Sequence, residues 1–154
     1  MTRSAALRRL GPLLLVLVTV TPAVSGCVTP ARNQTQYRGK ASAALQAAGS
    51  NVATGLLAVR QDREDKVLPT YADEVVSAAE TSMGSVSASF GSVQPPDVAS
   101  AALRDTVGDA LTAAEDALGH ARIAVRSGRS AALAASEQEL RSAQQALDKL
   151  EQEA

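Results

Sequence analysis

Residues 133–150 read LAASEQELRSAQQALDKL and carry the most regular hydrophobic repeat of the chain. Small or apolar residues recur there at alternating spacings of three and four, at Leu133, Ser136, Leu140, Ala143, Leu147 and Leu150. This spacing places successive side chains on one face of a helix, and charged and amide residues fill many of the other positions. The stretch therefore predicts an amphipathic helix over about 130–152 whose apolar face must pack against other helices.

Three earlier stretches, at about 35–66, 70–92 and 97–127, show the same helical period, and none alternates as a strand would. Their expected core residues are Ala41, Leu45, Ala48, Val52, Leu56 and Val59 in the first, Ala72, Val75, Val76, Ala79, Met83, Val86 and Phe90 in the second, and Leu103, Val107, Ala110, Leu111, Ala114, Leu118, Ala121 and Val125 in the third. Short connections between long helices favour antiparallel neighbours. The sequence thus predicts an all-α fold, an antiparallel up-down-up-down four-helix bundle over 35–154. Its alanine-rich seams favour a slim, closely packed rod.

Local signals suggest where these helices begin and end. Thr70 with Asp73 matches a capping box at the start of the second helix. Asp97, which follows two prolines, is a good N-cap for the third helix. Gly128 suits the left-handed residue that closes that helix, and Ser130 is expected to cap the fourth.

Two features of the first hairpin are less settled by the sequence. The Gly49–Asn51 stretch is the weak point of the first helix, where a kink or a brief break is an open alternative. Tyr37 and Tyr71 lie at opposite ends of the hairpin, and we expect both to cover the core with their hydroxyls in water.

The first 26 residues have the layout of an export signal. A basic start, which includes Arg8 and Arg9, precedes the apolar run LLLVLV at 13–18. Glycine and proline residues interrupt the apolar stretch well below the ~20 residues that a bilayer span needs. We therefore predict a cleaved segment over 1–26 rather than a transmembrane helix.

The only cysteine of the chain follows that segment directly. Val24-Ser25-Gly26-Cys27 resembles the lipobox of bacterial lipoproteins. The resemblance implies cleavage between Gly26 and Cys27, a diacylglyceryl group on the cysteine thiol and an optional N-acyl chain, such as palmitate. Residues 27–34 would then be a lipidated tether that holds the bundle at the extracytoplasmic face of the cell membrane, where two acyl chains anchor stably. The alternatives are a soluble export signal with a chance cysteine, or a buried free thiol.

Three further stretches, YRGKA at 37–41, SFGSVQPPD at 89–97 and RIAVRSG at 122–128, are similar to a group of small actinobacterial lipoproteins. The similarity implies a helical domain anchored in the cell envelope. That group provides no activity or functional residue to carry over to this chain.

Charge and composition exclude several classes of function. Removal of residues 1–26 takes away three of the 15 basic residues and none of the 16 acidic ones, which leaves 12 against 16 and a net charge of −4. Nucleic-acid binding would favour a basic stripe, which is absent from the sequence. Aromatic residues make up 2% of the chain, which argues against stacking platforms and large aromatic-lined pockets.

The sequence shows no recognisable catalytic or metal-binding constellation. His120 is the only histidine, and Asp116 four residues earlier is its expected structural partner. The Glu-x-x-His pairs of di-iron bundles are absent. Met83 and His120 together could ligate a haem, but there is no C-x-x-C-H attachment site and the core period already explains Met83. We therefore predict no catalytic residue, no metal ligand and no cofactor other than the lipid on Cys27.

One charged cluster stands out by its position. It consists of Arg60, Asp62, Arg63, Glu64, Asp65 and Lys66. In an antiparallel bundle tethered at Cys27, this cluster and the basic turn at 126–130 lie at the end far from the membrane. The cluster is a candidate surface for a partner; the alternative is a solvated helix end with weak local ion pairs.

The prediction for function is a lipid-anchored, non-enzymatic protein of the cell envelope that acts as an adaptor, spacer or accessory subunit for an envelope protein still to be identified. The alternative is a binding module that holds a small apolar ligand, a metal or a haem between its helices. The heptad of the last helix could serve an internal seam or a second chain, so the sequence leaves the oligomeric state open.

Overall fold

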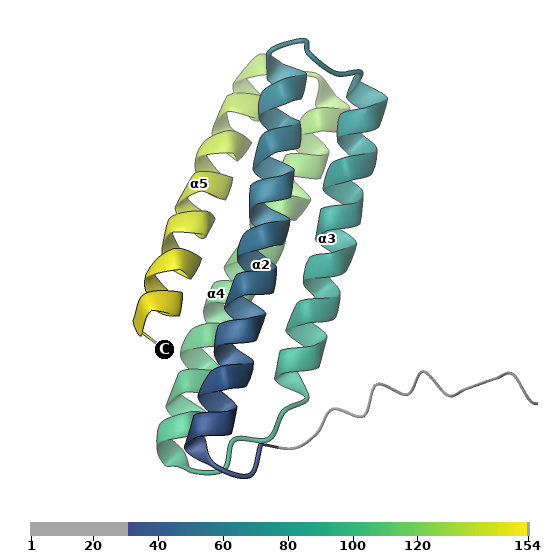
Figure 1. Cartoon of the computed structure of the whole chain (residues 1–154). Helices are drawn as coiled ribbons and strands as arrows, with labels where there is room; N and C mark the ends of the chain where they lie inside the picture. Colours follow the sequence, from purple (N-terminus) through teal and green to yellow (C-terminus); the bar gives the residue numbers. More distant parts are fainter. Residues whose placement is uncertain (1–30, 154) are drawn as a thin grey trace, which may run out of the picture.

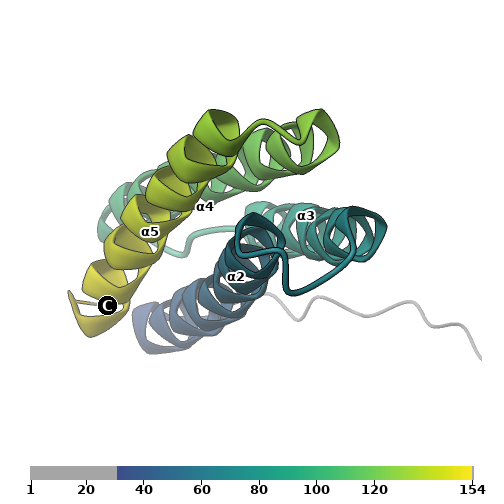
Figure 2. The same cartoon turned by 90° about the horizontal axis from the view of Figure 1, so that it is seen from above.

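The computed structural model describes residues 31–153 as four long helices that form an antiparallel bundle (Figure 1). They are α2 (Gln34–Arg63), α3 (Pro69–Gly91), α4 (Val98–Ser127) and α5 (Ser130–Glu153). Each helix packs against its two neighbours around the bundle, and α2 also packs against α4 across the centre. The view along the bundle shows α2 beside α3 and α5 beside α4 (Figure 2). The predicted fold class is confirmed.

The core follows the predicted periodicity closely. All the residues expected in it are buried or pack against the buried core, with the heptad of α5 facing the interior of this bundle. A close approach between α2 and α4 occurs at Gly55, where a Cβ atom would lie 2.4 Å from Cδ2 of the fully buried Leu118. A side chain at position 55 would therefore force the two helices or Leu118 to move.

The first helix ends three residues earlier than the sequence predicted. Asp65 adopts a left-handed conformation with φ of 53°. Its N–H donates to the Asp62 carbonyl, and the Lys66 N–H donates to the Gln61 carbonyl. This pair of hydrogen bonds is a Schellman motif, which satisfies the last carbonyls of a helix. Sequence reasoning missed it because an aspartate occupies the position that glycine usually takes.

The interior of α2 is continuous through Gly49, so the open question about a break there is resolved. Two hydroxyls on the following turns bond back along the helix: Ser50 Oγ donates to the Gln46 carbonyl at 3.0 Å and Thr54 Oγ to the Ser50 carbonyl at 2.8 Å. These bonds let polar residues remain inside a helix without interrupting its backbone.

Two of the predicted caps are wrong and two are confirmed. The predicted Thr70–Asp73 capping box does not form, because α3 already begins at Pro69 and its N-cap, Leu68, offers no side-chain acceptor. Proline fits this first position because its missing N–H would have no helical partner there. Ser130 is likewise the first residue of α5 rather than its cap.

The confirmed caps lie at the two ends of α4. The Asp97 side chain accepts a hydrogen bond of 2.7 Å from the Ser100 N–H, and this bond lowers the pKa of Asp97. At the other end, Gly128 has φ of 62°, a conformation that glycine adopts without steric cost.

The two tyrosines behave differently from one another. Tyr37 is fully buried beside Phe90, with 5.8 Å between ring centroids, and its hydroxyl has no hydrogen-bond partner. Burial raises the pKa of that hydroxyl. The expectation of a hydroxyl in water is therefore wrong for Tyr37, while Tyr71 is 61% exposed.

Candidate functional site

The predicted signal segment and the lipidation site at Gly26 and Cys27 lie outside the described residues. The described chain begins at Ala31, at the end of the bundle where α2 and α4 start (Figure 1). We call this the proximal end. The opposite end, formed by the loops at 64–68 and 128–129, is the distal end. None of the helices within 31–153 combines the length and the apolar character needed to cross a bilayer.

The charged cluster lies at the distal end, but the structure divides its members between different roles. Arg60 and Arg63 reach across to α5 and bind the carboxylate of Glu137, at 3.4 and 2.9 Å. Arg141 binds the same carboxylate from within α5. The Glu137 side chain is 3% exposed, whereas the three arginine side chains are about 40% exposed. Arg60 and Arg63 therefore tie α2 to α5.

The acidic members of the cluster also differ from one another. Asp62 is buried, and burial, followed by the nearby charge of Asp65, raises its pKa. Glu64 accepts a hydrogen bond of 2.7 Å from Lys66, which lowers the pKa of Glu64. In the basic turn, Arg126 is held by Asp73 of α3 at 2.8 Å. Much of the charge at this end is thus satisfied within the bundle.

Two large apolar side chains beside the cluster are exposed, and sequence reasoning missed both, because it expected Tyr71 to cover the core. Leu68 is 72% exposed and Tyr71 is 61% exposed. They lie on adjoining positions at the start of α3, where the Tyr71 N–H donates to the Leu68 carbonyl. Together with Asp65 and Lys66 they form what we call the distal patch. Tyrosine is enriched at protein-binding surfaces, whose rim is polar.

The structure places the two residues that were weighed for haem in different environments. Met83 is fully buried in the core. His120 is on the surface, with its side chain 63% exposed, and its Nδ1 lies 2.9 Å from the Glu139 carboxylate of α5. The expected partner Asp116 is therefore wrong, because the neighbouring helix offers a closer carboxylate. Within 31–153 no three acidic, histidine or cysteine residues gather in the manner of a metal site.

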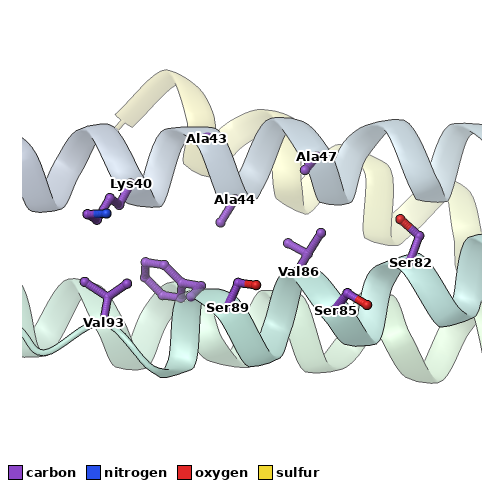
Figure 3. A pocket seen from close by; sticks show the side chains of 10 residues that line it. Lys40, Ala43, Ala44, Ala47, Ser82, Ser85, Val86, Ser89 and Val93 are labelled. Carbon is purple, nitrogen blue, oxygen red and sulfur yellow. The ribbon is translucent and has the colours of Figure 1, made fainter. Parts of the chain in front are cut away.

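A groove of about 480 Å³ lies between α2 and α3 near the proximal end (Figure 3). Buried side chains form its floor: Ala44, Phe90 and Val93. Its walls are Ala43 and Ala47 from α2 and Val86 and serines from α3, and Lys40 lies at its proximal end, beside Val93. Its volume is within the range of small-molecule sites. The periodicity alone could not reveal it, because the groove exists where two small-residue faces oppose each other.

No known protein family matches the chain, and no curated protein or solved structure is significantly similar to it.

Proposed function

We propose that this protein is a lipid-anchored, non-catalytic component of the cell envelope, held at the extracytoplasmic face through Cys27, that presents its distal patch to a partner protein. The observation that carries the proposal is the exposure of Leu68 and Tyr71 together at one corner of the bundle. Contiguous exposed apolar patches mark interaction sites on soluble proteins, and tyrosine is enriched among binding hot spots.

The shape of the bundle supports a presenting role. α2 has 30 residues, so it is about 45 Å long. A tether before Ala31 would hold the proximal end near the membrane and the distal patch about that far from it. The ties between Glu137 and the arginines of α2 hold the distal end of α2 against α5, directly before the loop that carries the patch.

The proposal is tested by site-specific photocrosslinking in intact envelopes. A benzophenone amino acid replaces Tyr71, and in a matched control chain it replaces Ile123, which is 57% exposed on α4. We expect one dominant crosslinked envelope protein from position 71 and none from position 123. Leu68→Ser in the same chain should remove the product, whereas Val98→Ser, an exposed apolar residue at the proximal end, should leave it unchanged.

The same cells test the anchor. Cys27→Ser should move the chain from the membrane fraction to the soluble fraction. A chain that stays in the membrane fraction would contradict the lipid anchor, and identical crosslinks from positions 71 and 123 would contradict the distal patch. The two parts of the proposal can therefore fail separately.

A further inference from the structure

The groove between α2 and α3 arises from a local shortage of side-chain volume. Along this part of the interface α2 offers alanines, and α3 offers Ser82, Ser85 and Ser89 with Val86 among them. Phe90 and Ala44 are already buried, but these short side chains do not fill the space outside them. The result is an elongated depression with an apolar floor, open to solvent along its length.

The dimensions of the groove suit one hydrocarbon chain. Its lining on α3 runs from Ser82 to Phe90, about 12 Å of helix, and Val93 extends it past the helix end. An acyl chain fills half of the ~30 Å hydrocarbon core of a bilayer, about 15 Å. The groove therefore accommodates most of one such chain along its length, and its volume of about 480 Å³ leaves no room for a bulky headgroup as well.

The positive charge of Lys40 indicates which polar group the hydrocarbon chain would carry at its end. Lys40 lies at the proximal end of the groove, and its ammonium makes no ion pair with any residue in 31–153. Its methylene stem borders the apolar floor while the ammonium remains in water, as is usual for lysine. A carboxylate beside this ammonium would gain an ion pair at the point where the hydrocarbon chain leaves the groove.

We propose that the groove binds a single long-chain fatty acid, with its carboxylate at Lys40 and its chain along Ala44 and Ala47 toward Ser82. Each methylene removed from water contributes about 0.8 kcal/mol, so the chain supplies most of the affinity and Lys40 orients it. The site lies at the opposite end of α2 from the distal patch and goes beyond the proposed adaptor function, so either proposal can hold without the other.

The test uses the full chain in phosphatidylcholine nanodiscs with a photoactivatable palmitic acid, and the labelled peptides are identified by mass spectrometry. We expect labelling of the peptides around 43–47 and 82–93. Ala47→Leu places a larger side chain in the groove and should reduce labelling at least tenfold. The control Ala53→Leu makes the same substitution at an exposed position of α2 outside the groove and should leave labelling unchanged. Should Ala47→Leu fail to fold, as judged by circular dichroism, Ser85→Leu blocks the opposite wall from an exposed position.

The role of Lys40 is tested with two probes. Lys40→Gln should weaken the apparent affinity for palmitic acid about fivefold, the upper range for an exposed ion pair, and should not change the affinity for its methyl ester. Lys149→Gln, at an exposed lysine of α5, is the matched control.

Three outcomes would overturn the proposal. The first is labelling that persists in both blocked variants. The second is an absence of labelling in the parent chain. The third is labelling that appears only in Cys27→Ala, which would mean that an acyl chain of the protein's own anchor fills the groove.

Discussion

The carboxylate of Glu137 provides the sharpest test of what holds the distal end together. Glu137→Gln keeps the size of the side chain but removes the charge that Arg60, Arg63 and Arg141 share. One carboxylate oxygen binds Arg60 and Arg141, and the other binds Arg63. An amide has one acceptor oxygen, and its NH₂ group would face at least one guanidinium as a second donor.

The expected loss of unfolding free energy follows from the exposure of the carboxylate and of the three guanidinium groups. Exposed ion pairs contribute about 0.2–1 kcal/mol, whereas breaking a fully buried pair costs about 3–5 kcal/mol. Here the carboxylate is 3% exposed, but the guanidiniums that lose it are about 40% exposed and regain water. We therefore expect a loss between these limits, about 1.5–3 kcal/mol, the range of hydrogen bonds to charged groups.

The assay is urea denaturation of a chain that begins at residue 28, followed by far-ultraviolet circular dichroism. Glu139→Gln is the matched control: it lies on the same helix, is 50% exposed and contacts His120, so its loss should stay below about 0.5 kcal/mol. Pairing Glu137→Gln with Arg63→Gln in a double-mutant cycle should show a coupling of at least about 0.5 kcal/mol. Equal losses at positions 137 and 139, or additive effects in the cycle, would refute the reasoning.

Two other substitutions test the packing and the charge of α2. Gly55→Ala should destabilise the fold by up to about 2 kcal/mol, because overpacking against Leu118 at about 1–3 kcal/mol exceeds the ~1 kcal/mol that alanine adds to helix stability. Gly108→Ala is the control, because a new Cβ atom there meets nothing within 4 Å, and it should stabilise the fold by about 0.5–1 kcal/mol. If urea denaturation shows that both substitutions stabilise the fold, or that both destabilise it, the close approach of α2 to α4 is contradicted. Asp62→Asn should stabilise the chain at pH 7 and lose that advantage below about pH 4. Because the pKa of Asp62 is raised, the folded chain keeps the Asp62 proton to a higher pH than the unfolded chain does. The free energy of unfolding of the parent therefore falls as pH rises from the unfolded-state pKa of about 3.9 through the folded-state pKa. Parallel stability profiles for parent and Asp62→Asn between pH 3 and pH 7 would show that this carboxylate carries no burial cost.

The fold was predictable because the apolar period of each helix is strong and the connections are short. The heptad from Leu133 to Leu150 faces the interior, as its spacing indicates. The Asp97 side chain accepts a hydrogen bond from the first turn of α4, and Gly128 takes the left-handed conformation at its end. Both residues are the types that usually occupy these positions, so the two caps could be recognised from the local sequence. The end of α2 could not, because its left-handed residue is Asp65, whereas glycine is the residue that usually marks this conformation in a sequence.

The candidate site was less predictable because its properties depend on which helices become neighbours. Arg60 and Arg63 look like solvated charges in the sequence, and only the packing of α5 beside α2 brings Glu137 to them. The same holds for His120, whose partner is Glu139 rather than the carboxylate one turn away. Leu68 lies in the connection between α2 and α3, outside the helical period that marks core positions, so the period gave no information about its exposure.

Small residues have opposite consequences at different levels of this bundle. Where Gly55 faces the large Leu118 of α4, the missing side chain lets the two helices meet and the core closes. Where alanines of α2 face Ser85 and Ser89 of α3, both sides are small, and a groove of about 480 Å³ remains instead of a close contact. The expectation of a closely packed rod thus holds across the centre of the bundle but not along the outer α2–α3 seam. Phe90 and Val93 are already buried, so a ligand in the groove would gain from covering the partly exposed Ala47 and Val86 and from removing its own hydrocarbon from water, and it would stabilise the bundle as it binds.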